Sequence, residues 1–346
     1  MRPFESLVAL GHEQLVLCSD PSCGYRGIIA VHSTVLGPAV GGTRWWTYPS
    51  EEAAITDALR LSRGMSFKNA LARLPLGGGK SVILGAPNAT DRPAILRAHG
   101  RFIDRLGGVY ITAEDVGTSP ADMELIADTT RFVAGRAGAS GDPSPHTARG
   151  VFRAMQAAAA FRWGSDRLGG KAVAIQGLGN VGMNLARQLV AAGARVVVSD
   201  IDPDKVEVAA RELGATVVPV DRIHAVKADV FAPCALGAIL NDRSIGELAV
   251  EIIVGGANNQ LLEPAHGKQV ADRGITYVPD YVANAGGVSY GGSIEVLKLS
   301  VAEALERVDR IYDTTLLVLK RAQAEGVPPS DAADRMAEER IAAARR

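Results

Sequence analysis

The feature that most constrains this chain is a glycine-rich turn at residues 177–182, which match the pattern G-x-G-x-x-G. It follows residues 171–176, a nearly continuous apolar run typical of a strand buried on both faces of a parallel sheet, and it opens an apolar helix pattern. Gly177 would permit the tight turn, Gly179 the close approach of backbone to a pyrophosphate, and Gly182 close packing of helix on strand. This context favours a dinucleotide site over a glycine-rich turn without a ligand.

Two carboxylates near the end of the next predicted strand compete for a cofactor role. Asp202 precedes Pro203, so its better interpretation is the N-cap of the following helix. Asp200 closes the strand, where it would accept hydrogen bonds from ribose hydroxyls and repel a 2′-phosphate. Ile201 follows it, and no adjacent arginine would hold such a phosphate. The sequence therefore predicts NAD rather than NADP.

The chain length and the element pattern predict two α/β domains. A chain of 346 residues exceeds one ordinary core. Turn-forming residues 138–143 are the candidate hinge, so we expect a first α/β domain at 1–136 and a doubly wound Rossmann-type domain at 137–327, with 328–346 returning to the first. The elements expected are strands at 27–32, 171–176, 195–199, 230–232 and 252–255, helices capped by Ser50 and Ser119, helices at 147–161 and 301–325, and a shorter helix after Ser330.

Composition excludes several classes of protein. The formal net charge of -1 gives no electrostatic case for nucleic acid. We expect neither a secretory leader nor a membrane span, because acidic residues appear early and no apolar run is long enough. Three cysteines leave at least one unpaired, as in a reducing cytoplasm. Cys18 and Cys23 lack a second Cys/His pair, so we interpret them as buried thiols and expect no metal.

Two lysines and an aspartate are the candidate chemical groups. Lys80 follows three glycines, which would let a substrate or cofactor come against the backbone. Lys68 lies twelve positions earlier, and a desolvated ammonium near another should have a lowered pKa, which suits an anion clamp or a general base. Asp115 lies in a predicted loop before the Ser119-capped helix. Taken singly, each has an ordinary alternative: a solvated lysine or a helix cap.

Together these segments resemble the glutamate/leucine/phenylalanine/valine dehydrogenase family. The resemblance runs from about residue 11 to about residue 313, and leucine-type members are the most similar. Its strongest pieces are residues 36–44, the two lysine segments, and residues 112–117, 141–145, 231–235, 256–259 and 284–287. The family implies a catalytic α/β domain followed by a Rossmann domain, with the active site in the cleft between them, and a homo-oligomer.

The resemblance also implies a role for each matching residue. Lys68 would hold the substrate α-carboxylate with backbone near Gly41 and Gly42, Lys80 would activate water, and Asp115 would shuttle a proton to and from the amino nitrogen. The substrate contacts expected are Lys68, Gly41, Gly42, Val40, Met65, Ala113, Asn258, Val288 and Gly291. The cofactor contacts expected are Gly177, Gly179, Asn180, Val181, Gly182, Asp200, Thr147, Ala232, Cys234, Ala235, Ala257 and Asn258.

The substrate pocket is expected to be apolar. By the resemblance, Val40 and Val288 stand where glutamate enzymes need polar groups, so a second carboxylate would be buried without a partner. Aromatic-preferring relatives tend to carry Gly at the position of Ala113, which favours branched-chain substrates here. Gly291 replaces a valine common in leucine-type members and widens the pocket. His146 is interpreted as a partly exposed loop residue in preference to a substrate contact. Trp45 and Trp46 are interpreted as core residues in preference to pocket lining.

We therefore predict NAD-dependent deamination of a branched-chain L-amino acid to its 2-oxo acid and ammonium, and the reverse reaction. A phenylalanine- or tryptophan-preferring member of the same family is the nearest alternative. A catalytically silent dinucleotide-binding protein is less consistent with Lys68, Lys80 and Asp115. A 2-hydroxy-acid dehydrogenase would be expected to use a histidine near an arginine instead.

Overall fold

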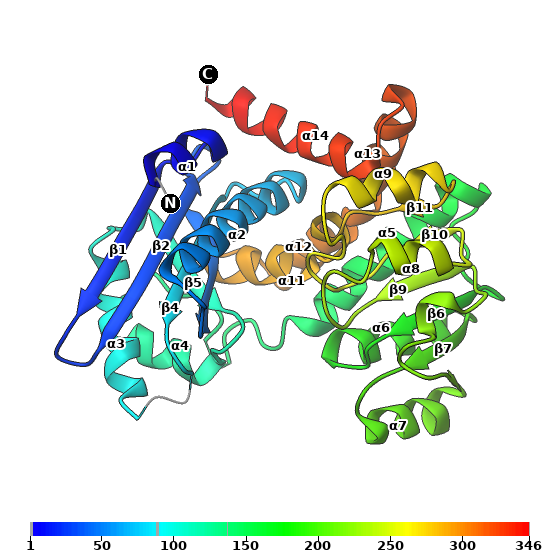
Figure 1. Ribbon diagram of the computed structural model, residues 1–346, viewed down its shortest axis with the longest axis horizontal. Helices are drawn as coiled ribbons and strands as arrows, with labels where there is room; N and C mark the ends of the chain where they lie inside the picture. Colours follow the sequence, from blue (N-terminus) through cyan, green and yellow to red (C-terminus); the bar gives the residue numbers. More distant parts are fainter. Residues whose placement is uncertain (1–2, 88–89, 137, 346) are drawn as a thin grey trace. The chain divides into compact units, whose positions relative to one another are not determined.

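The chain folds into two compact units in the computed structural model, which describes residues 3–87, 90–136 and 138–345 (Figure 1). The first unit comprises Met1–Gly141, Gly291–Ser300 and Ala337–Arg346, and the second comprises Asp142–Tyr290 and Val301–Met336. The sequence placed the division after residue 136 and assigned 291–300 to the second domain. That short segment groups with the first unit because the Glu295 carboxylate accepts hydrogen bonds from Gly135 N and Ser140 Oγ.

A five-stranded mixed sheet forms the centre of the first unit. Its order is β1-β2-β4-β3-β5. β1 and β4 run antiparallel to β2, whereas β3 runs parallel to both β4 and β5. The strands are β1 (Gln14–Asp20), β2 (Tyr25–Ser33), β3 (Ala39–Trp46), β4 (Gly77–Leu84) and β5 (Tyr110–Glu114).

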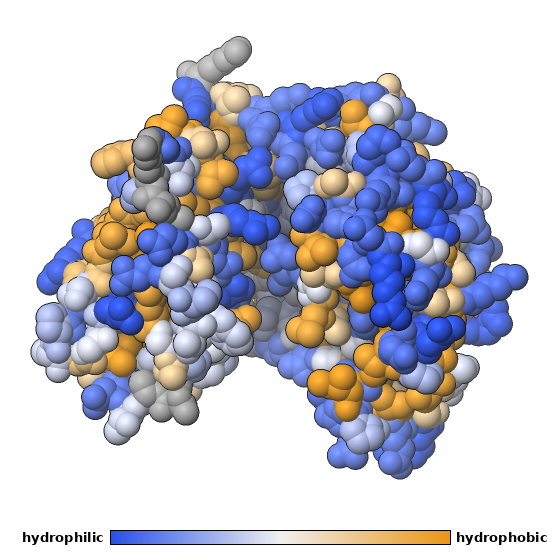
Figure 2. All heavy atoms as spheres, viewed as in Figure 1, coloured by the Kyte–Doolittle hydropathy of each residue, from blue (hydrophilic) through white to orange (hydrophobic). Residues whose placement is uncertain are grey.

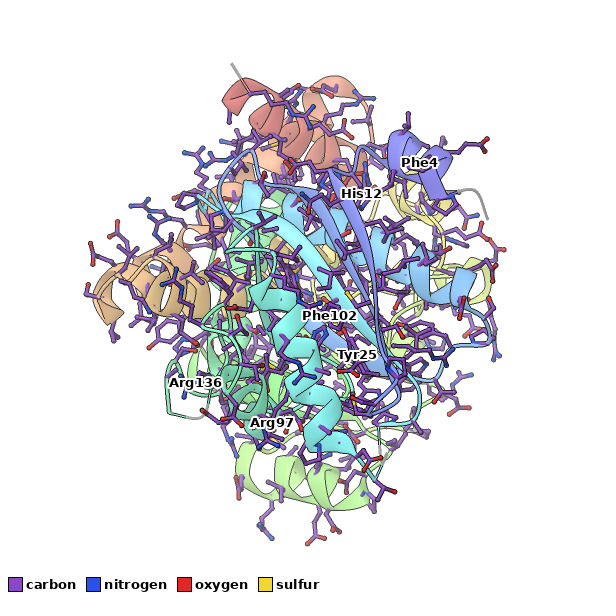
Figure 3. The ribbon with its side chains drawn as sticks, turned by 90° about the vertical axis from the view of Figure 1, so that its left-hand side faces the viewer. Phe4, His12, Tyr25, Arg97, Phe102 and Arg136 are labelled. Carbon is purple, nitrogen blue, oxygen red and sulfur yellow. The ribbon has the colours of Figure 1, made fainter. Side chains whose placement is uncertain are left out.

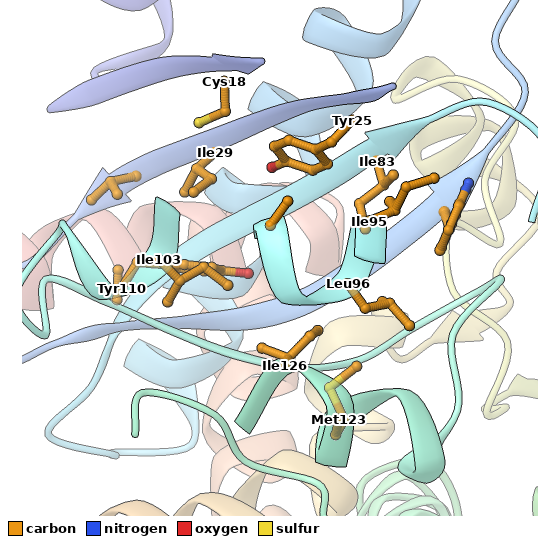
Figure 4. Packing of buried hydrophobic residues seen from close by; sticks show 14 residues of the cluster. Cys18, Tyr25, Ile29, Ile83, Ile95, Leu96, Ile103, Tyr110, Met123 and Ile126 are labelled. Atoms are coloured by element: carbon orange, nitrogen blue, oxygen red, sulfur yellow. The ribbon is translucent and has the colours of Figure 1, made fainter. Parts of the chain in front are cut away.

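Helices cover both faces of this sheet. Long α2 (Glu51–Leu71) packs through Ala54, Ala58 and Leu59 against β2 and β4. The other face packs against α3 (Arg92–Asp104) and α4 (Pro120–Ala127), whose apolar side chains interdigitate with those of the strands (Figure 4). On that side Tyr25 stacks on Phe102 of α3, with ring centroids 5.5 Å apart (Figure 3).

The predicted helix caps are confirmed in this unit. Ser50 Oγ accepts from Ala53 N at the start of α2. Ser119 and Asp122 form a reciprocal capping box at the start of α4, which satisfies two backbone donors that a helix end otherwise leaves unpaired. A further short helix, α1 (Pro3–Leu10), precedes β1. In the described part of the chain no helix is long and apolar enough to cross a membrane.

The second unit is a doubly wound parallel sheet, which confirms the predicted fold class. All its strand pairs are parallel, and the order is β8-β7-β6-β9-β10-β11. Counted from β6, this is the 3-2-1-4-5-6 order of dinucleotide-binding folds, with the switch point between β6 and β9. The strands are β6 (Ala172–Gln176), β7 (Arg195–Ser199), β8 (Thr216–Val217), β9 (Val230–Pro233), β10 (Ile252–Ile253) and β11 (Thr276–Tyr277).

Helices lie on both faces of this sheet as well. Residues of η1, α8 and α9 join Ala174, Phe231 and Ile253 of the strands in one apolar core. On the other side α5 and α6 pack together. The elements are α5 (Ser144–Trp163), α6 (Asn180–Ala191), α7 (Pro203–Leu213), η1 (Ile223–Ala225), α8 (Asp242–Glu247), α9 (Ala265–Asp272), α10 (Asp280–Ala283) and α11 (Gly286–Gly291). The π-helical turn that follows, η2 (Gly292–Val296), belongs to the first unit.

The C-terminal helices differ from the prediction. The single helix expected at 301–325 is two, α12 (Val301–Asp309) and α13 (Ile311–Glu325), with a change of direction at Arg310 (Figure 1). Both pack on α5, and Arg149 of α5 holds the last residue of α12 by two hydrogen bonds to Asp309, at 2.8 and 2.6 Å. The final helix, α14 (Pro329–Ala344), has 16 residues and is shorter than the helix expected at 301–325, as predicted.

Candidate active site

A buried lysine–aspartate pair lies on the α2 face of the first sheet. Lys80 Nζ is 2.8 Å from Asp115 Oδ2, and only 6% of the lysine side chain is exposed. Lys80 belongs to β4 and Asp115 directly follows β5, the two neighbours of β3 in the sheet. Two residues separated by a strand and by 35 positions are thus brought into contact by the parallel arrangement.

The pair shifts the titration of both members. Burial lowers the pKa of Lys80, although Asp115 opposes that shift. Burial alone would raise the pKa of Asp115, but Lys80 and Arg44 together outweigh it, so that the pKa is lowered. The site therefore combines a lysine that releases its proton more readily than usual with a carboxylate that stays ionised. General-base chemistry at Lys80 needs the first of these properties.

Arg44 is the cation that sequence reasoning missed. Its Nε donates to Asp115 Oδ2 at 2.9 Å, and its Nη1 donates to Asp57 Oδ2 of α2, also at 2.9 Å. Tyr48 donates its hydroxyl to the same Asp57 oxygen at 2.5 Å. The like charge expected to act on Lys80 comes in part from this arginine. Alternation along β3 was the available signal, because it puts Arg44 on the face of Gly42.

The glycines before Lys80 make room for protein atoms, which corrects the expectation that a ligand approaches them. A Cβ at Gly78 would lie 2.0 Å from Ser66 N of α2, and one at Gly79 would lie 2.6 Å from the Tyr110 ring. Gly78 thus lets α2 pack against the backbone of β4. On β3, a Cβ at Gly42 would lie 2.8 Å from Asp115 Cβ. Gly42 is therefore needed for Asp115 to occupy its place.

Lys68 and Met65 lie on the helix that covers this face. Both are half-buried on α2, in the turns around Ser66. Gly41 and Gly42 lie on β3, where Gly42 pairs with Ala113 of β5 and Tyr110 donates its hydroxyl to Gly41 O at 2.6 Å. The first unit thus contains the residues expected to bind the α-carboxylate and the two expected to move protons.

A surface hollow of about 620 Å³ lies beside Arg44 and Asp57. The two adjacent tryptophans of β3 differ in exposure, which corrects one prediction. Trp45 is core as expected, with 1% exposed, but Trp46 is 50% exposed, because adjacent strand residues point to opposite faces. The hollow is lined by Arg44, Trp46, Tyr48, Glu52, Ala53, Thr56, Asp57, Arg60 and Val116.

The opposite face of the same strands carries an uncharged polar network. Thr43 Oγ1 lies 2.8 Å from Ser81 Oγ and 2.6 Å from Thr112 Oγ1, so the hydroxyls link β3, β4 and β5. His99 of α3 places Nε2 3.0 Å from Thr43 Oγ1 and Nδ1 2.7 Å from the Tyr25 hydroxyl. Burial lowers the pKa of His99 to about 3, so the imidazole is neutral at physiological pH.

The expected pocket-wall residues fall in both units. Val40 is buried in a cluster with Leu74 and Leu76, which bracket Pro75 and were missed in the sequence. Val296 and Leu297 of the Gly291–Ser300 segment pack on that cluster. Ala113 is half-buried on β5, and Val288 lies on α11 in the second unit. A Cβ at Gly291 would contact Ser140 Oγ at 3.5 Å, an ordinary van der Waals distance.

The glycine turn of the second unit has the geometry of a phosphate-binding loop. Gly177 has φ +93° and no room for a side chain against Ala235. A Cβ at Gly182 would lie 2.0 Å from Gly177 O, so only glycine lets the helix pack this closely on the turn. At Gly179, by contrast, no atom lies within 4 Å of the Cβ position. Gly179 is the N-cap of α6, whose positive dipole end suits a pyrophosphate. These residues fit a dinucleotide.

Asp200 lies beside this turn. Its Oδ2 accepts from Leu178 N at 2.5 Å and its Oδ1 from Asp202 N at 2.9 Å. Asp202 caps α7 by accepting from Asp204 N, as predicted. The structure thus separates the two candidates, with Asp200 at the glycine turn and Asp202 at a helix end.

The remaining expected cofactor residues occupy the carboxyl side of the second sheet or lie close to it. Asn258 is exposed, and its Oδ1 accepts from Asn284 Nδ2 at 2.8 Å, a contact that sequence reasoning missed. Thr147 donates its hydroxyl to Pro143 O in the first turn of α5. Ala232 lies in β9, one residue before its end, and Cys234, Ala235 and Ala257 follow β9 and β10. Burial raises the pKa of Cys234 to about 11. Asn180 and Val181 begin α6.

His146 is not in a loop. It lies in the first turn of α5 and is half-buried. Its ring stacks on Tyr290, with centroids 3.5 Å apart and planes 10° apart. Burial lowers its pKa. His146 therefore packs the first turn of α5 against α11 within the second unit.

A doubly wound sheet with a dinucleotide turn, and a separate unit with a buried lysine–aspartate pair, define the class of nicotinamide-dependent oxidoreductases. Residues 12–132 match the family model for the Glu/Leu/Phe/Val dehydrogenase dimerisation domain, and residues 202–346 match that for Glutamate/Leucine/Phenylalanine/Valine dehydrogenase. The chain belongs to this family and is an amino-acid dehydrogenase.

Relatives with different named substrates are similarly close. The leucine dehydrogenase of Thermoactinomyces intermedius is 51% identical over 99% of this chain and 94% of that protein. The valine dehydrogenase of Streptomyces coelicolor is 47% identical over 97% of this chain and 93% of that protein. The crystal structure of L-tryptophan dehydrogenase from Nostoc punctiforme has a TM-score of 0.89 and 46% identity, covering 99% of each chain.

Proposed function

We propose that this enzyme catalyses NAD-dependent oxidative deamination of branched-chain L-amino acids, together with the reverse reductive amination. The buried Lys80–Asp115 pair carries the proposal, since the two groups differ in titration as a base and a proton shuttle require. In the forward direction the amino acid loses a hydride from Cα, water supplies the keto oxygen, and the nitrogen leaves as ammonium. The bound dinucleotide accepts that hydride.

Each residue then has a distinct task. Lys68, with backbone at Gly41 and Gly42, holds the α-carboxylate and orients Cα. Asp115 accepts a proton from the amino nitrogen and returns it to the departing ammonia. Burial lowers the pKa of Lys80, and once it has lost its own proton it takes one from the water that adds to the imine carbon. Arg44 helps to keep the resting Asp115 ionised, so that its carboxylate is ready to accept the proton from the amino nitrogen.

The proposed cofactor preference rests on the carboxylate of Asp200. It stands at the end of β7 against the glycine turn and would repel a 2′-phosphate. Ile201, the next residue, is 89% exposed and offers such a phosphate no partner. Asn258 and Thr147 would border the nicotinamide. NAD should therefore be strongly preferred over NADP.

The proposed substrate class follows from the apolar side chains near the pair. Val40 lies among Leu74 and Leu76, and these groups offer no partner for a second carboxylate or a hydroxyl. Ala113 adds a methyl group where an aromatic ring would want space. Leucine-, valine- and isoleucine-like substrates fit this description, and glutamate does not.

An aromatic substrate is the second candidate. Gly291 removes a side chain from the segment that contributes Val296 and Leu297 to the Val40 cluster. The similarity to an L-tryptophan dehydrogenase also favours it. One methylene of fit is worth only about 1–3 kcal/mol, so the preference among apolar substrates is shallow.

We also propose a homo-oligomer. The matching family model for residues 12–132 is described as a dimerisation domain. β1 is an edge strand with Leu17 65% exposed, and Phe4 and Val8 of α1 are more than four-fifths exposed. Figure 2 shows apolar surface over this part of the first unit. An edge strand flanked by exposed apolar side chains suits association with another copy.

The test is an assay of NADH oxidation with a panel of 2-oxo acids, with and without ammonium. We expect 2-oxoisocaproate and 2-oxoisovalerate to be good substrates, phenylpyruvate poor and 2-oxoglutarate negligible. NADPH in place of NADH should give little activity. Activity without ammonium would indicate 2-hydroxy-acid chemistry, no activity with any oxo acid would indicate a silent binding protein, and phenylpyruvate as the best substrate would refute the argument from Ala113.

A further inference from the structure

Two cations share a single oxygen of Asp115. Lys80 Nζ and Arg44 Nε both lie within 3 Å of Oδ2, at 2.8 and 2.9 Å. The backbone N of Asp115 is held separately, by Thr118 Oγ1 at 3.0 Å. With one carboxylate oxygen occupied by two charge-assisted contacts, the side chain is fixed in one orientation and the oxygens become inequivalent.

Arg44 is itself held from the other side. Its guanidinium reaches Asp57 through Nη1 while Nε holds Asp115, so its planar fork spans two carboxylates that lie on different elements. Tyr48 donates to the same Asp57 oxygen, which fixes that carboxylate in turn. The result is a line of alternating charge running Lys80, Asp115, Arg44, Asp57.

We propose that Arg44 is a positioning residue that holds Asp115 by Oδ2, so that Oδ1 exchanges the proton with the substrate nitrogen, and that Arg44 and Asp57 set in opposite senses the pH at which Lys80 becomes a base. This inference rests on the proposed function. It assigns Arg44 and Asp57 to the working of the pair, although neither touches the reacting atoms.

The opposite senses follow from the charges that face the pair. Burial is the largest influence on the pKa of Lys80 and lowers it; Asp115 on the β5 side raises it, Arg44 on β3 lowers it, and Asp57 on α2 raises it. Further ionisable groups of this region are the Tyr48 phenol, which hydrogen-bonds Asp57, the Tyr110 phenol, and Lys68 on α2. Glu52 and Arg60 of α2 also line the hollow beside Arg44 and Asp57. Removing Arg44 should therefore raise the pKa of Lys80, and neutralising Asp57 should lower it.

The experiment compares the pH dependence of oxidative deamination in three variants and the parent enzyme. Activity should rise with pH as Lys80 loses its proton, and the ionisation of the substrate is common to all four enzymes. For Arg44→Gln we expect the midpoint of this rise in activity to move to a pH about one unit higher. For Asp57→Asn we expect the midpoint to move to lower pH by a smaller amount.

Arg44→Lys is the matched control. It restores the positive charge but not the planar guanidinium that contacts two carboxylates. The pH at which activity rises should therefore stay near that of the parent, while kcat falls. Thermal melting of each variant separates loss of fold from loss of function. The inference would be overturned if activity rose at the same pH in the parent, Arg44→Gln and Asp57→Asn enzymes, whatever their kcat values. It would also be overturned if the two variants shifted this pH in the same direction. A parent inactive on every oxo acid would instead refute the proposed function.

Discussion

The two faces of the first sheet carry polar groups of opposite character, although the residues alternate along the same strands. On the α2 face Lys80, Asp115 and Arg44 are charged and paired. On the α3 face, one position away in sequence, Ser81 and Thr43 belong to a network of hydroxyl and imidazole groups without charge. A buried charge is costly unless it is paired, so charge is kept where chemistry needs it.

The comparison separates the roles of the faces. The neutral network ties β3, β4 and β5 together at Thr43, Ser81 and Thr112, each within three positions of a charged residue. It fixes strand register without competing for protons, because His99 stays neutral and Tyr25 stays protonated, its pKa raised well above the usual value by burial. Changes on the charged face should alter kinetics, and changes on the neutral face should alter stability.

The largest effect after the Lys80–Asp115 pair itself is expected at Lys68, on the helix covering the charged face. Lys68→Ala removes the cation proposed to hold the α-carboxylate. We expect KM for the amino acid to rise by a factor on the order of a hundred, equivalent to about 3 kcal/mol, with a smaller fall in kcat. Steady-state kinetics measure this, and an unchanged KM would remove Lys68 from the site.

His99→Ala tests the neutral face. It leaves the buried Tyr25 and Thr43 hydroxyls without their imidazole partner, so the free energy of unfolding should fall by about 2–4 kcal/mol. Urea denaturation measures this, with kcat of the folded variant as the contrast. A variant of full stability but much lower kcat would show that the network acts in chemistry and would break the distinction between the faces.

The same histidine should produce an acid dependence of stability. Its pKa is about 3 in the folded protein against 6.5 in the unfolded chain, so the unfolded state binds the proton first. His99 therefore contributes stability that is full above pH 6.5 and falls by about 1.4 kcal/mol per pH unit below it. His99→Asn should show a shallower loss between pH 6.5 and 4, measured by urea titrations; parallel curves for parent and variant would contradict the neutral assignment.

The smallest effect is expected at the pocket edge. Gly291→Val adds a side chain where a Cβ has ordinary contact distance to Ser140 Oγ, so the fold should tolerate it. We expect kcat/KM to fall most for the longest 2-oxo acids, by a factor of about ten, since a methylene changes specificity by about 1–3 kcal/mol. An equal loss on all substrates would place Gly291 outside the pocket.

The fold was largely predictable because its signals are local. The glycine turn, the buried strand before it and the caps at Ser50 and Ser119 each depend on a few consecutive residues. The break at Arg310 was not predictable, because apolar periodicity continues through it and the turn depends on how α12 and α13 both pack on α5. The number and type of elements are therefore easier to predict than where a helix bends.

The candidate site was predictable in part. Lys80 and Asp115 lie in recognisable motifs, and the structure brings them together. Arg44 lies in a motif too, but its partner Asp57 is on α2, and only tertiary packing puts them in contact. The same is true of the glycines before Lys80, whose neighbours Ser66 and Tyr110 come from other elements. The catalytic and binding roles remain predictions.

Turnover of the neighbouring variants Lys80→Ala and Ser81→Ala, at saturating amino acid and NAD, tests the central claim most directly. The two residues are adjacent on β4 and point to opposite faces of one sheet. We expect kcat of Lys80→Ala to fall by a factor on the order of hundreds or more, as loss of a general base does, and that of Ser81→Ala to change by only about two- to threefold with a lower melting temperature. Near-normal turnover by Lys80→Ala, or an equal loss in both variants, would contradict the account.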